Sequence, residues 1–172
     1  LRGRERLSVP SLSVVVTNFD GEQYLPGMMN ALRATGYPFH EIIVSDDASR
    51  DGSRLLMRHN YPEVKLVSSD VNRGPSPTRN AGIRTATGDL VLLLDNDGQP
   101  FPDAIEPMVE MLEADADLVG VMPRVILRGE PPLVHCDGAR THFTGQMWLL
   151  NGHVPVDTAP RDPEPIQSLM GT

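Results

Sequence analysis

Short apolar runs alternate along residues 12–121 with segments of helical spacing, and this alternation constrains the fold more than any other feature. The apolar runs predict strands at 12–17, 41–45, 64–67, 90–94 and 118–121. Helical spacing and helix-start signals predict helices at 22–35, 51–59, 75–86 and 102–113. Strands that alternate with such helices form a mostly parallel sheet with helices on both faces. We therefore predict an α/β fold with right-handed crossovers and the sheet order 3-2-1-4.

One predicted strand ends in two acids. Residues 90–94 are all apolar, which predicts a strand buried on both faces, and Asp95, Asn96 and Asp97 follow it. Carboxylates one residue apart suit a hard divalent cation, which takes oxygen ligands and keeps positions open for substrate phosphates. The alternative is a loop with two solvated acids, so the pair indicates a metal-bound diphosphate only together with other features.

Polar residues also end the first and second predicted strands. Thr17 and Asn18 end the first, and Asp46 and Asp47 end the second. Ligands bind open α/β sheets at the carboxyl ends of strands, where the strand order reverses. A carboxylate of Asp46 or Asp47 can accept a hydrogen bond from a nucleobase N–H or a ribose hydroxyl. The alternative is a turn residue that also caps the following helix.

A polar segment at 72–82 lies between the third and fourth strands. It combines a turn at Gly74, a predicted helix start at Pro75 and a basic side chain, Arg79, one turn into the helix. Exposed amide groups at a helix start, together with Arg79, can bind an anion. An ordinary helix cap without a ligand is the alternative.

The composition is that of an ordinary globular domain. The chain has 172 residues, of which 40% are hydrophobic and 22% charged. Its net charge of −8 argues against nucleic acid as the main partner, because phosphate backbones are bound by clustered Lys and Arg. No apolar run could span a membrane, no signal peptide is visible, and the lone Cys136 can form no internal disulfide. We therefore expect a cytoplasmic location, with the inner membrane face as a peripheral alternative.

Composition also divides the chain. A polar leader covers 1–10, the α/β core covers 11–121, and residues 122–172 are rich in Pro and Gly. Apolar pieces at 125–127, 133–135 and 147–150 predict an irregular β extension. Trp148 is expected to pack within this extension, with stacking on an acceptor sugar as the alternative.

In order and spacing, four elements resemble the motifs of the family 2 glycosyltransferases of the GT-A fold. The Val-rich first strand with its Thr/Asn turn is matched by 14–18, and the Asp-Asp-x-Ser element by 46–49. The Asn-x-Gly, Arg-Asn-x-Gly-Ile and Ala-x-Gly series is matched by Asn72, Gly74, Arg79, Asn80, Gly82, Ile83, Ala86 and Gly88. The Asp-x-Asp motif is matched by Asp95 and Asp97.

The resemblance implies a Rossmann-like GT-A nucleotide-binding fold and a function in sugar transfer. The donor would be a nucleotide-diphosphate sugar, and the acceptor a saccharide or lipid-linked hydroxyl, as in bacterial polysaccharide biosynthesis. The resemblance places nucleotide-sugar contacts at Thr17, Asn18, Asp46, Asp47, Arg79, Asp95 and Asn96. It assigns Mg²⁺ or Mn²⁺ to Asp97 and Asp95, where the ion would neutralise the leaving diphosphate.

One part of the family pattern has no convincing match. Inverting members place a general base and an Arg-containing motif beyond an acceptor-side segment, whose start residues 168–171 resemble. Glu164 is a weak candidate for the base, so we expect the base beyond Thr172. We therefore expect an inverting hexosyl- or deoxyhexosyltransferase. Taken alone, this chain is expected to bind the donor but to transfer little or no sugar.

Parts of the sequence also bear on three other functions. Residues 94–98 resemble the nucleophile strand of haloacid dehalogenase-type phosphatases, but that family carries this motif on its first strand and prefers Thr or Val where Gln99 stands. A dinucleotide dehydrogenase would need a Gly-rich turn after the first strand, where only Gly21 is found. A nucleotide-binding fragment without activity of its own is the non-enzymatic alternative.

Overall fold

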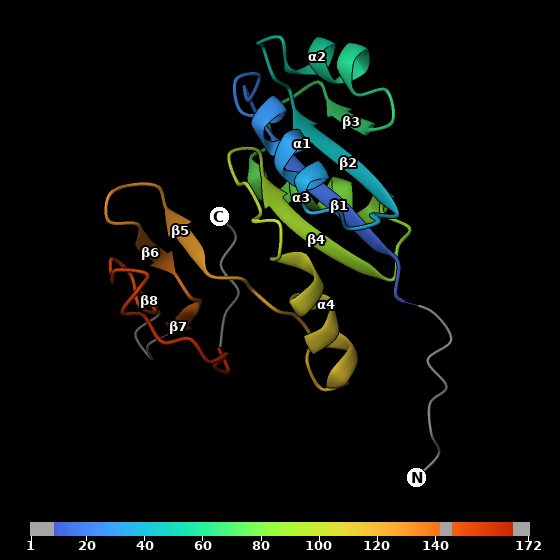
Figure 1. The fold of residues 1–172 in the computed structure, drawn as a ribbon. Helices are drawn as coiled ribbons and strands as arrows, with labels where there is room; N and C mark the ends of the chain where they lie inside the picture. Colours follow the sequence, from blue (N-terminus) through green and yellow to red (C-terminus); the bar gives the residue numbers. More distant parts are fainter. Residues whose placement is uncertain (1–8, 142–145, 167–172) are drawn as a thin grey trace, which may run out of the picture. The chain divides into compact units, whose positions relative to one another are not determined.

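The computed structural model describes residues 9–141 and 146–166 of the chain. Its contacts divide the chain into two units, one that reaches Ile105 and one that starts at Glu106 (Figure 1). The domain boundary expected at residue 121 stays a prediction.

The first unit is built on a four-stranded parallel sheet. Its strands are β1 (Leu12–Asn18), β2 (Glu41–Asp47), β3 (Lys65–Ser69) and β4 (Leu90–Asp95), in the order β3-β2-β1-β4. The helices between them are α1 (Leu25–Ala34), α2 (Ser53–Asn60) and α3 (Pro75–Thr85), and α4 (Ile105–Ala114) follows β4. The predicted α/β fold and sheet order are confirmed.

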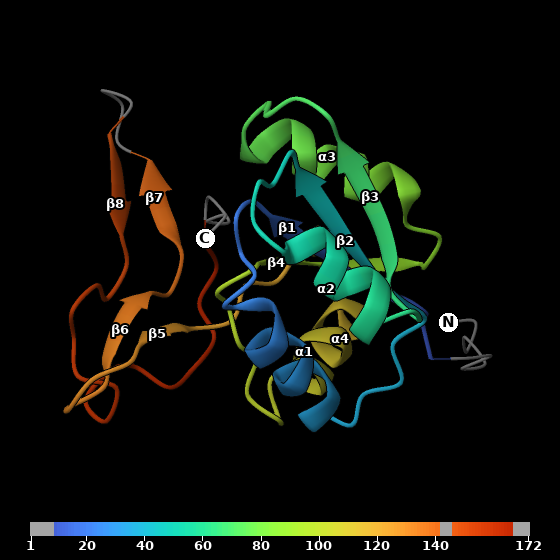
Figure 2. The same cartoon turned by 90° about the horizontal axis from the view of Figure 1, so that it is seen from above.

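Helices cover both faces of this sheet (Figure 2). Side chains alternate along a strand, so Val14, Val16 and Val44 point to one face, where they form a buried core with the apolar side of α1. Val15 points to the other face, where it lies against Gly82 of α3. The central strands are apolar on both faces because each face is covered by a helix.

Gly82 allows α3 to approach the sheet closely. A Cβ atom built at this position would lie 2.4 Å from Val15 Cγ1. Ala normally stabilises a helix by about 1 kcal/mol relative to Gly, but here the overlap is the larger effect. We expect Gly82→Ala to lower the free energy of unfolding by about 1–3 kcal/mol in urea titrations. Asn80→Ala, an exposed change on the same helix, is the control, and equal stability of the two variants would contradict the close packing.

Strand β4 is not buried on both faces, and that prediction is wrong. Val91 and Leu93 are 39% and 43% exposed. Both point to the α3 side of the sheet, where α3 packs on β1 and β2, and β4 is the edge strand. An apolar run reports the hydrophobicity of a strand, not the number of layers that cover it.

The strand expected at 118–121 is also wrong, since the described structure has no strand there. The Leu118 N–H donates to the Asp115 carbonyl at 3.3 Å in a turn after α4, and Val119 is fully exposed. Strand preference depends on packing against cross-strand neighbours. Residues 118–121 have no such neighbour among the described residues.

The second unit contains two short antiparallel pairs. Strand β5 (Val125–Leu127) pairs with β6 (Leu133–Cys136), and β7 (Ala139–Thr141) pairs with β8 (Met147–Leu149). The three expected β pieces are confirmed, whereas β7 was missed because three residues carry too little periodicity. Trp148 is 64% exposed, so the expected packing is wrong. A ladder of two three-residue strands has too little surface to cover an indole ring.

Asp137 joins the loops of the second unit. Its two carboxylate oxygens accept hydrogen bonds from Arg124 Nε at 2.7 Å and Arg124 Nη2 at 2.8 Å, and Asn151 Nδ2 donates at 2.8 Å. Partial burial raises the pKa of Asp137, but the hydrogen bonds from Arg124 and Asn151 outweigh it and lower the pKa below its usual value.

This lowered pKa predicts a stability contribution that depends on pH. The ionised carboxylate stabilises the fold above its unfolded pKa of about 3.9, and this contribution is lost as pH falls through the lower folded pKa. Asp137→Asn should therefore be less stable than the wild type at pH 7 and closer to it at pH 3, as followed by Trp148 fluorescence in urea. The exposed Asp157→Asn is the control. A stability deficit of the same size at both pH values would contradict the assignment.

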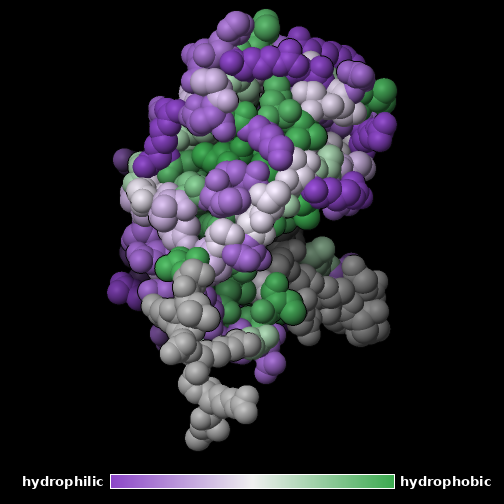
Figure 3. Space-filling model, turned by 90° about the vertical axis from the view of Figure 1, so that its right-hand side faces the viewer, coloured by the Kyte–Doolittle hydropathy of each residue, from purple (hydrophilic) through white to green (hydrophobic). Residues whose placement is uncertain are grey.

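No helix among the described residues combines the length and apolar character needed to cross a bilayer. Figure 3 shows a face of the molecule on which hydrophilic residues surround smaller hydrophobic areas.

Candidate functional site

The strand register separates the polar strand ends into two groups. In β1, Thr17 lies opposite Asp95 of β4, and Asn18 lies opposite Asp46 of β2. Paired residues of parallel strands point to the same face, and consecutive residues point to opposite faces. The side of α3 therefore receives Thr17, Asp47 and Asp95, and the side of α1 receives Asn18, Asp46 and Asn96.

Asp46 is the centre of the group on the α1 side. It is 1% exposed and accepts hydrogen bonds from Asn18 Nδ2 (2.8 Å), Arg54 Nε (2.6 Å) and both the backbone and the side chain of Ser49. Burial raises the pKa of Asp46, but the hydrogen bonds from Ser49, Arg54 and Asn18 outweigh it and lower the pKa below its usual value. The Asp46 carboxylate is thus occupied by contacts within the protein.

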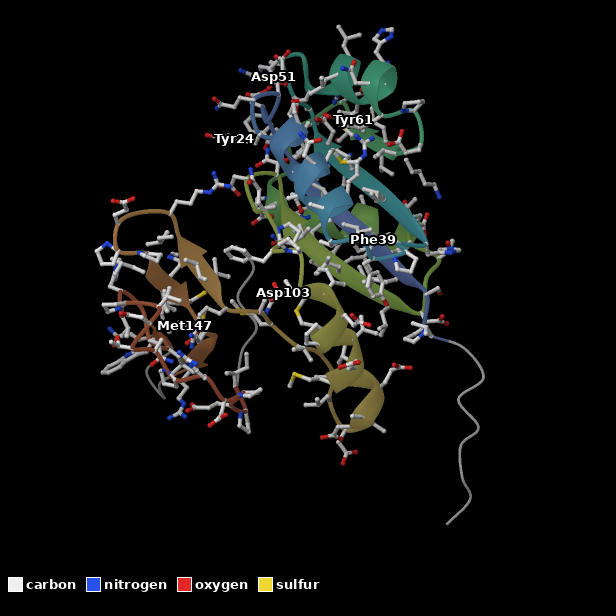
Figure 4. The ribbon with its side chains drawn as sticks, viewed as in Figure 1. Tyr24, Phe39, Asp51, Tyr61, Asp103 and Met147 are labelled. Carbon is white, nitrogen blue, oxygen red and sulfur yellow. The ribbon has the colours of Figure 1, made fainter. Side chains whose placement is uncertain are left out.

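Hydrogen bonds tie the loops after β1 and β2 to each other, and Figure 4 shows Asp51 in the second of these loops. The Arg50 N–H donates to Asp20 Oδ1 at 2.7 Å, and the Glu22 N–H donates to Asp51 Oδ2 at 2.8 Å. Asp20 has the left-handed φ of 48°, which Asp tolerates in turns. These bonds fix the turn that carries Phe19, a residue that is 44% exposed.

Asp47 holds the start of α3 against the sheet. Its Oδ1 accepts a hydrogen bond from the Arg73 N–H, and its Oδ2 accepts one from the Gly74 N–H, both at 2.8 Å. Gly74 has a φ of 85°, which favours glycine at this turn. Each carboxylate oxygen has a further lone pair, so Asp47 can accept another hydrogen bond from a ligand.

Arg79 of α3 and Asp95 of β4 form an ion pair. Arg79 Nη2 donates to Asp95 Oδ1 at 2.9 Å, and both side chains are about a fifth exposed. The chain then turns, because the Gly98 N–H donates to the Asp95 carbonyl at 3.0 Å. This turn exposes Asp97, whose carboxylate has no hydrogen bond or ion pair among the described residues.

An open pocket of about 380 Å³ lies at this edge of the first unit. It is lined by Thr17, Asn18, Phe19, Asp47, Asn72, Gly74, Pro75, Asp95, Asn96 and Asp97. Asp46 and Arg79 stand behind this lining, in contact with Asn18 and Asp95. Sequence reasoning missed Phe19, although an aromatic residue directly after a polar strand end was a usable signal.

The pocket residues fit a metal ion that is bound together with a diphosphate. No group of three or more His, Cys, Asp and Glu side chains converges within the part of the chain that the structure describes. The exposed Asp97 carboxylate and nearby Asp95 supply few ligands, which suits Mg²⁺ or Mn²⁺ that takes its other ligands from phosphates and water. Thr17 Oγ1 lines the same pocket and is a buried hydroxyl with no partner among the described residues.

Glu164, the weak candidate for a general base, is an exposed residue of the second unit, and its role stays a prediction.

Comparison with known sequences gives a consistent result. Residues 13–160 match the model of a family described as Glycosyl transferase family 2. An undecaprenyl-phosphate 4-deoxy-4-formamido-L-arabinose transferase of Aeromonas hydrophila is 37% identical over 120 residues, which cover 66% of this chain and 37% of the relative. The succinoglycan biosynthesis protein ExoO of Rhizobium meliloti is 32% identical over 114 residues, which cover 66% of this chain and 33% of ExoO. The chain spans about a third of the length of these curated relatives.

Solved structures show the same fold. The mannosyltransferase PcManGT of Pyrobaculum calidifontis, in complex with GDP-Man and Mn²⁺, superposes with a TM-score of 0.57 and 26% identity over 66% of this chain and 35% of its own. S. aureus TarS in complex with UDP-GlcNAc superposes with a TM-score of 0.54 and 24% identity over 60% of this chain and 31% of its own.

Proposed function

Because the chain belongs to glycosyl transferase family 2, we propose that it binds a nucleotide-diphosphate sugar at the carboxyl edge of its parallel sheet, for transfer of the sugar to an acceptor hydroxyl. The observation that carries this proposal is the pocket that brings Asp47, Asp95 and Asp97 together beside the start of α3. A phosphatase of the haloacid dehalogenase type is not supported, since the family match lies elsewhere and Asp95 is engaged by Arg79.

The contacts suggest distinct roles for the two acids that end β2. Asp47 faces the pocket and has free lone pairs, so it accepts a hydrogen bond from the nucleoside, while Asp46 positions Asn18 through its internal contacts. Asn18 in turn accepts a hydrogen bond from Asn96 Nδ2 at 2.9 Å, which orients the turn after β4. Thr17 offers the donor its hydroxyl, which has no partner among the described residues.

Asp97 and Asp95 would hold Mg²⁺ or Mn²⁺, which supplies charge neutralisation of the leaving diphosphate. This role agrees with the Mn²⁺ in the PcManGT complex. Arg79 donates to Asp95, and with an ion held at that carboxylate its guanidinium would be available to bind a phosphate.

We assign the reaction to inverting transfer of a hexose or deoxyhexose. The base that deprotonates the acceptor is not among the pocket residues, so we expect donor binding by this chain with little turnover. The names of ExoO and of the arabinose-derivative transferase support a saccharide or lipid-linked acceptor in bacterial polysaccharide biosynthesis. The enzyme would then act at the cytoplasmic face of the membrane.

A thermal-shift screen tests the proposal. Nucleotide sugars are added to the chain with Mn²⁺ or with excess chelator, because a ligand that binds only the folded state raises the melting temperature. At least one nucleotide sugar should raise it with Mn²⁺ and much less with chelator. A screen in which no nucleotide sugar or nucleoside diphosphate raises the melting temperature would contradict the proposal.

A further inference from the structure

A line of side-chain hydrogen bonds crosses the carboxyl edge of the sheet on the α1 side. Arg54 of α2 donates to the Ser69 carbonyl at the end of β3 and to Asp46 at the end of β2. Asn18, at the end of β1, donates from Nδ2 to Asp46 Oδ2 at 2.8 Å, and its Oδ1 accepts from Asn96 Nδ2 at 2.9 Å. Asn96 directly follows β4, so the line joins the ends of all four strands.

The orientation of the Asn18 amide in this line is fixed by its neighbours. A carboxylate only accepts hydrogen bonds, so Asp46 requires the NH₂ group of Asn18 on its side. The same Nδ2 also donates to Ser49 Oγ at 3.1 Å. The amide oxygen of Asn18 therefore faces the end of β4, where it accepts from Asn96. Asn18 is only 1% exposed, and buried amides depend on such internal partners.

Gly21 lies against the hydrogen bond between Asn18 and Asn96. A Cβ atom built on Gly21 would lie 2.2 Å from Asn18 Oδ1 and 2.1 Å from Asn96 Nδ2, on the hydrogen bond itself. The φ of Gly21 lies outside the left-handed region, so the backbone angle does not require glycine here. What requires glycine at this position is the room for the two amides.

The turn that carries Asp97 is held from both faces of the sheet. On the α3 side, Arg79 pairs with Asp95 at 2.9 Å, and on the α1 side, Asn18 holds Asn96. Asp97 is the next residue and is exposed. Because the two side chains before it are fixed on opposite faces, the turn presents the Asp97 carboxylate in a set direction.

We propose that the Asn18–Asn96 hydrogen bond is a positioning contact for the divalent ion, and that the missing side chain of Gly21 makes room for it. This inference rests on the proposed function, in which Asp97 and Asp95 hold Mn²⁺ or Mg²⁺. Groups behind metal ligands orient those ligands, and their loss typically lowers metal affinity about 10–100-fold. Asn18 and Asn96 act through the direction of Asp97 and need no contact with the ion.

A positioning contact and a direct contact with the nucleotide give different results. Loss of positioning removes the part of the nucleotide affinity that depends on Mn²⁺ and leaves the affinity in excess chelator unchanged. Loss of a direct contact lowers both affinities. Gly21→Ala separates the two cases, because it displaces the hydrogen bond but takes no polar group away from the pocket.

Isothermal titration calorimetry with UDP or GDP, whichever the wild type binds more tightly, tests the inference. We expect Gly21→Ala to lower the affinity with Mn²⁺ about tenfold and to leave the affinity in excess chelator unchanged. Asn96→Ala should show the same selective loss, and the double variant should bind no more weakly than the weaker single variant, because both changes remove one contact. Gly129→Ala is the control, since its Cβ atom would lie at an ordinary 3.6 Å from the Pro131 carbonyl oxygen in the second unit.

The chain without metal or nucleotide gives a second readout. The side-chain NH₂ of Asn96 donates a hydrogen bond, so its protons should exchange with solvent more slowly in NMR spectra than those of the exposed Asn80. Gly21→Ala should remove this protection, while urea unfolding checks that the variant stays folded. Protection that persists in Gly21→Ala would overturn the placement of Gly21 against the two amides.

Unchanged affinity with Mn²⁺ in a Gly21→Ala variant that has lost this protection would overturn the positioning role. An equal loss with Mn²⁺ and with chelator would overturn it as well, in favour of a direct contact with the nucleotide. In both cases the wild type still binds nucleotide and the proposed function stands. Failure of the wild type to bind either UDP or GDP would instead overturn the proposed function, and the inference with it.

Discussion

Asp97→Ala is expected to abolish metal-dependent donor binding while it leaves the stability of the fold almost unchanged. The Asp97 side chain is exposed and partnerless among the described residues, so its removal opens no cavity and breaks no internal contact. Because Asp97 would hold the ion that supplies positive charge to the diphosphate, we expect a loss in donor affinity of at least about a hundredfold, which corresponds to about 2.8 kcal/mol. Calorimetry with a nucleoside diphosphate and Mn²⁺ measures the affinity, and urea unfolding measures the stability.

Asp103→Ala is the matched control for this experiment, because it removes another exposed carboxylate of the first unit outside the pocket. If donor affinity is the same with Mn²⁺ and with excess chelator, Asp95 and Asp97 are not metal ligands but residues of the strand end and its turn.

Asp46→Asn should give the opposite result, with a large loss of stability. The change removes the negative charge that is paired with Arg54. The neutral amide also forms weaker hydrogen bonds with Asn18 and Ser49 than the carboxylate does. Removal of one partner of a buried ion pair costs about 3–5 kcal/mol, and the partial exposure of Arg54 reduces this to about 2–3 kcal/mol at pH 7. Because the pKa of Asp46 is lowered in the fold, the difference from the wild type should shrink as pH falls below about 4.

Urea unfolding of Asp46→Asn beside Asp70→Asn, an exposed acid of the same unit, checks this prediction. A fully stable Asp46→Asn that no longer binds nucleotide would show that Asp46 contacts the ligand directly. Asp47→Asn also loses one of the two acceptors for the Arg73 and Gly74 N–H groups, so we expect a smaller loss of stability than in Asp46→Asn. Our assignment of the two acids requires that the folded Asp47→Asn binds nucleotide more weakly than the wild type.

The sheet and its polar edge could be predicted because both follow from local patterns. Apolar runs that alternate with helical spacing predict the strands and their parallel arrangement, and parallel strands bring Thr17, Asp47 and Asp95 to one edge. The placement of Asp46 and Asp47 on opposite faces of the sheet also follows from the alternation of side chains along a strand. It could be resolved only once the register showed that Asp46 pairs with Asn18 and points toward α1.

Other features depend on contacts between distant segments, which no local pattern reports. The exposure of Val91 and Leu93 depends on how far α3 extends across the sheet, and the expected strand at 118–121 failed because no neighbour pairs with it. The pairing of Arg79 with Asp95 joins a helix to a strand sixteen positions away. Each of these outcomes was decided by tertiary packing and not by hydrophobicity.

A crystal structure of the chain with a nucleoside diphosphate and Mn²⁺ tests the central claim most directly, because it locates the ligand. Our account predicts the diphosphate and the ion beside Asp95 and Asp97, with the nucleoside within hydrogen-bond distance of Asp47. A nucleotide bound away from this edge of the sheet, or an ion held by none of these three carboxylates, would contradict it.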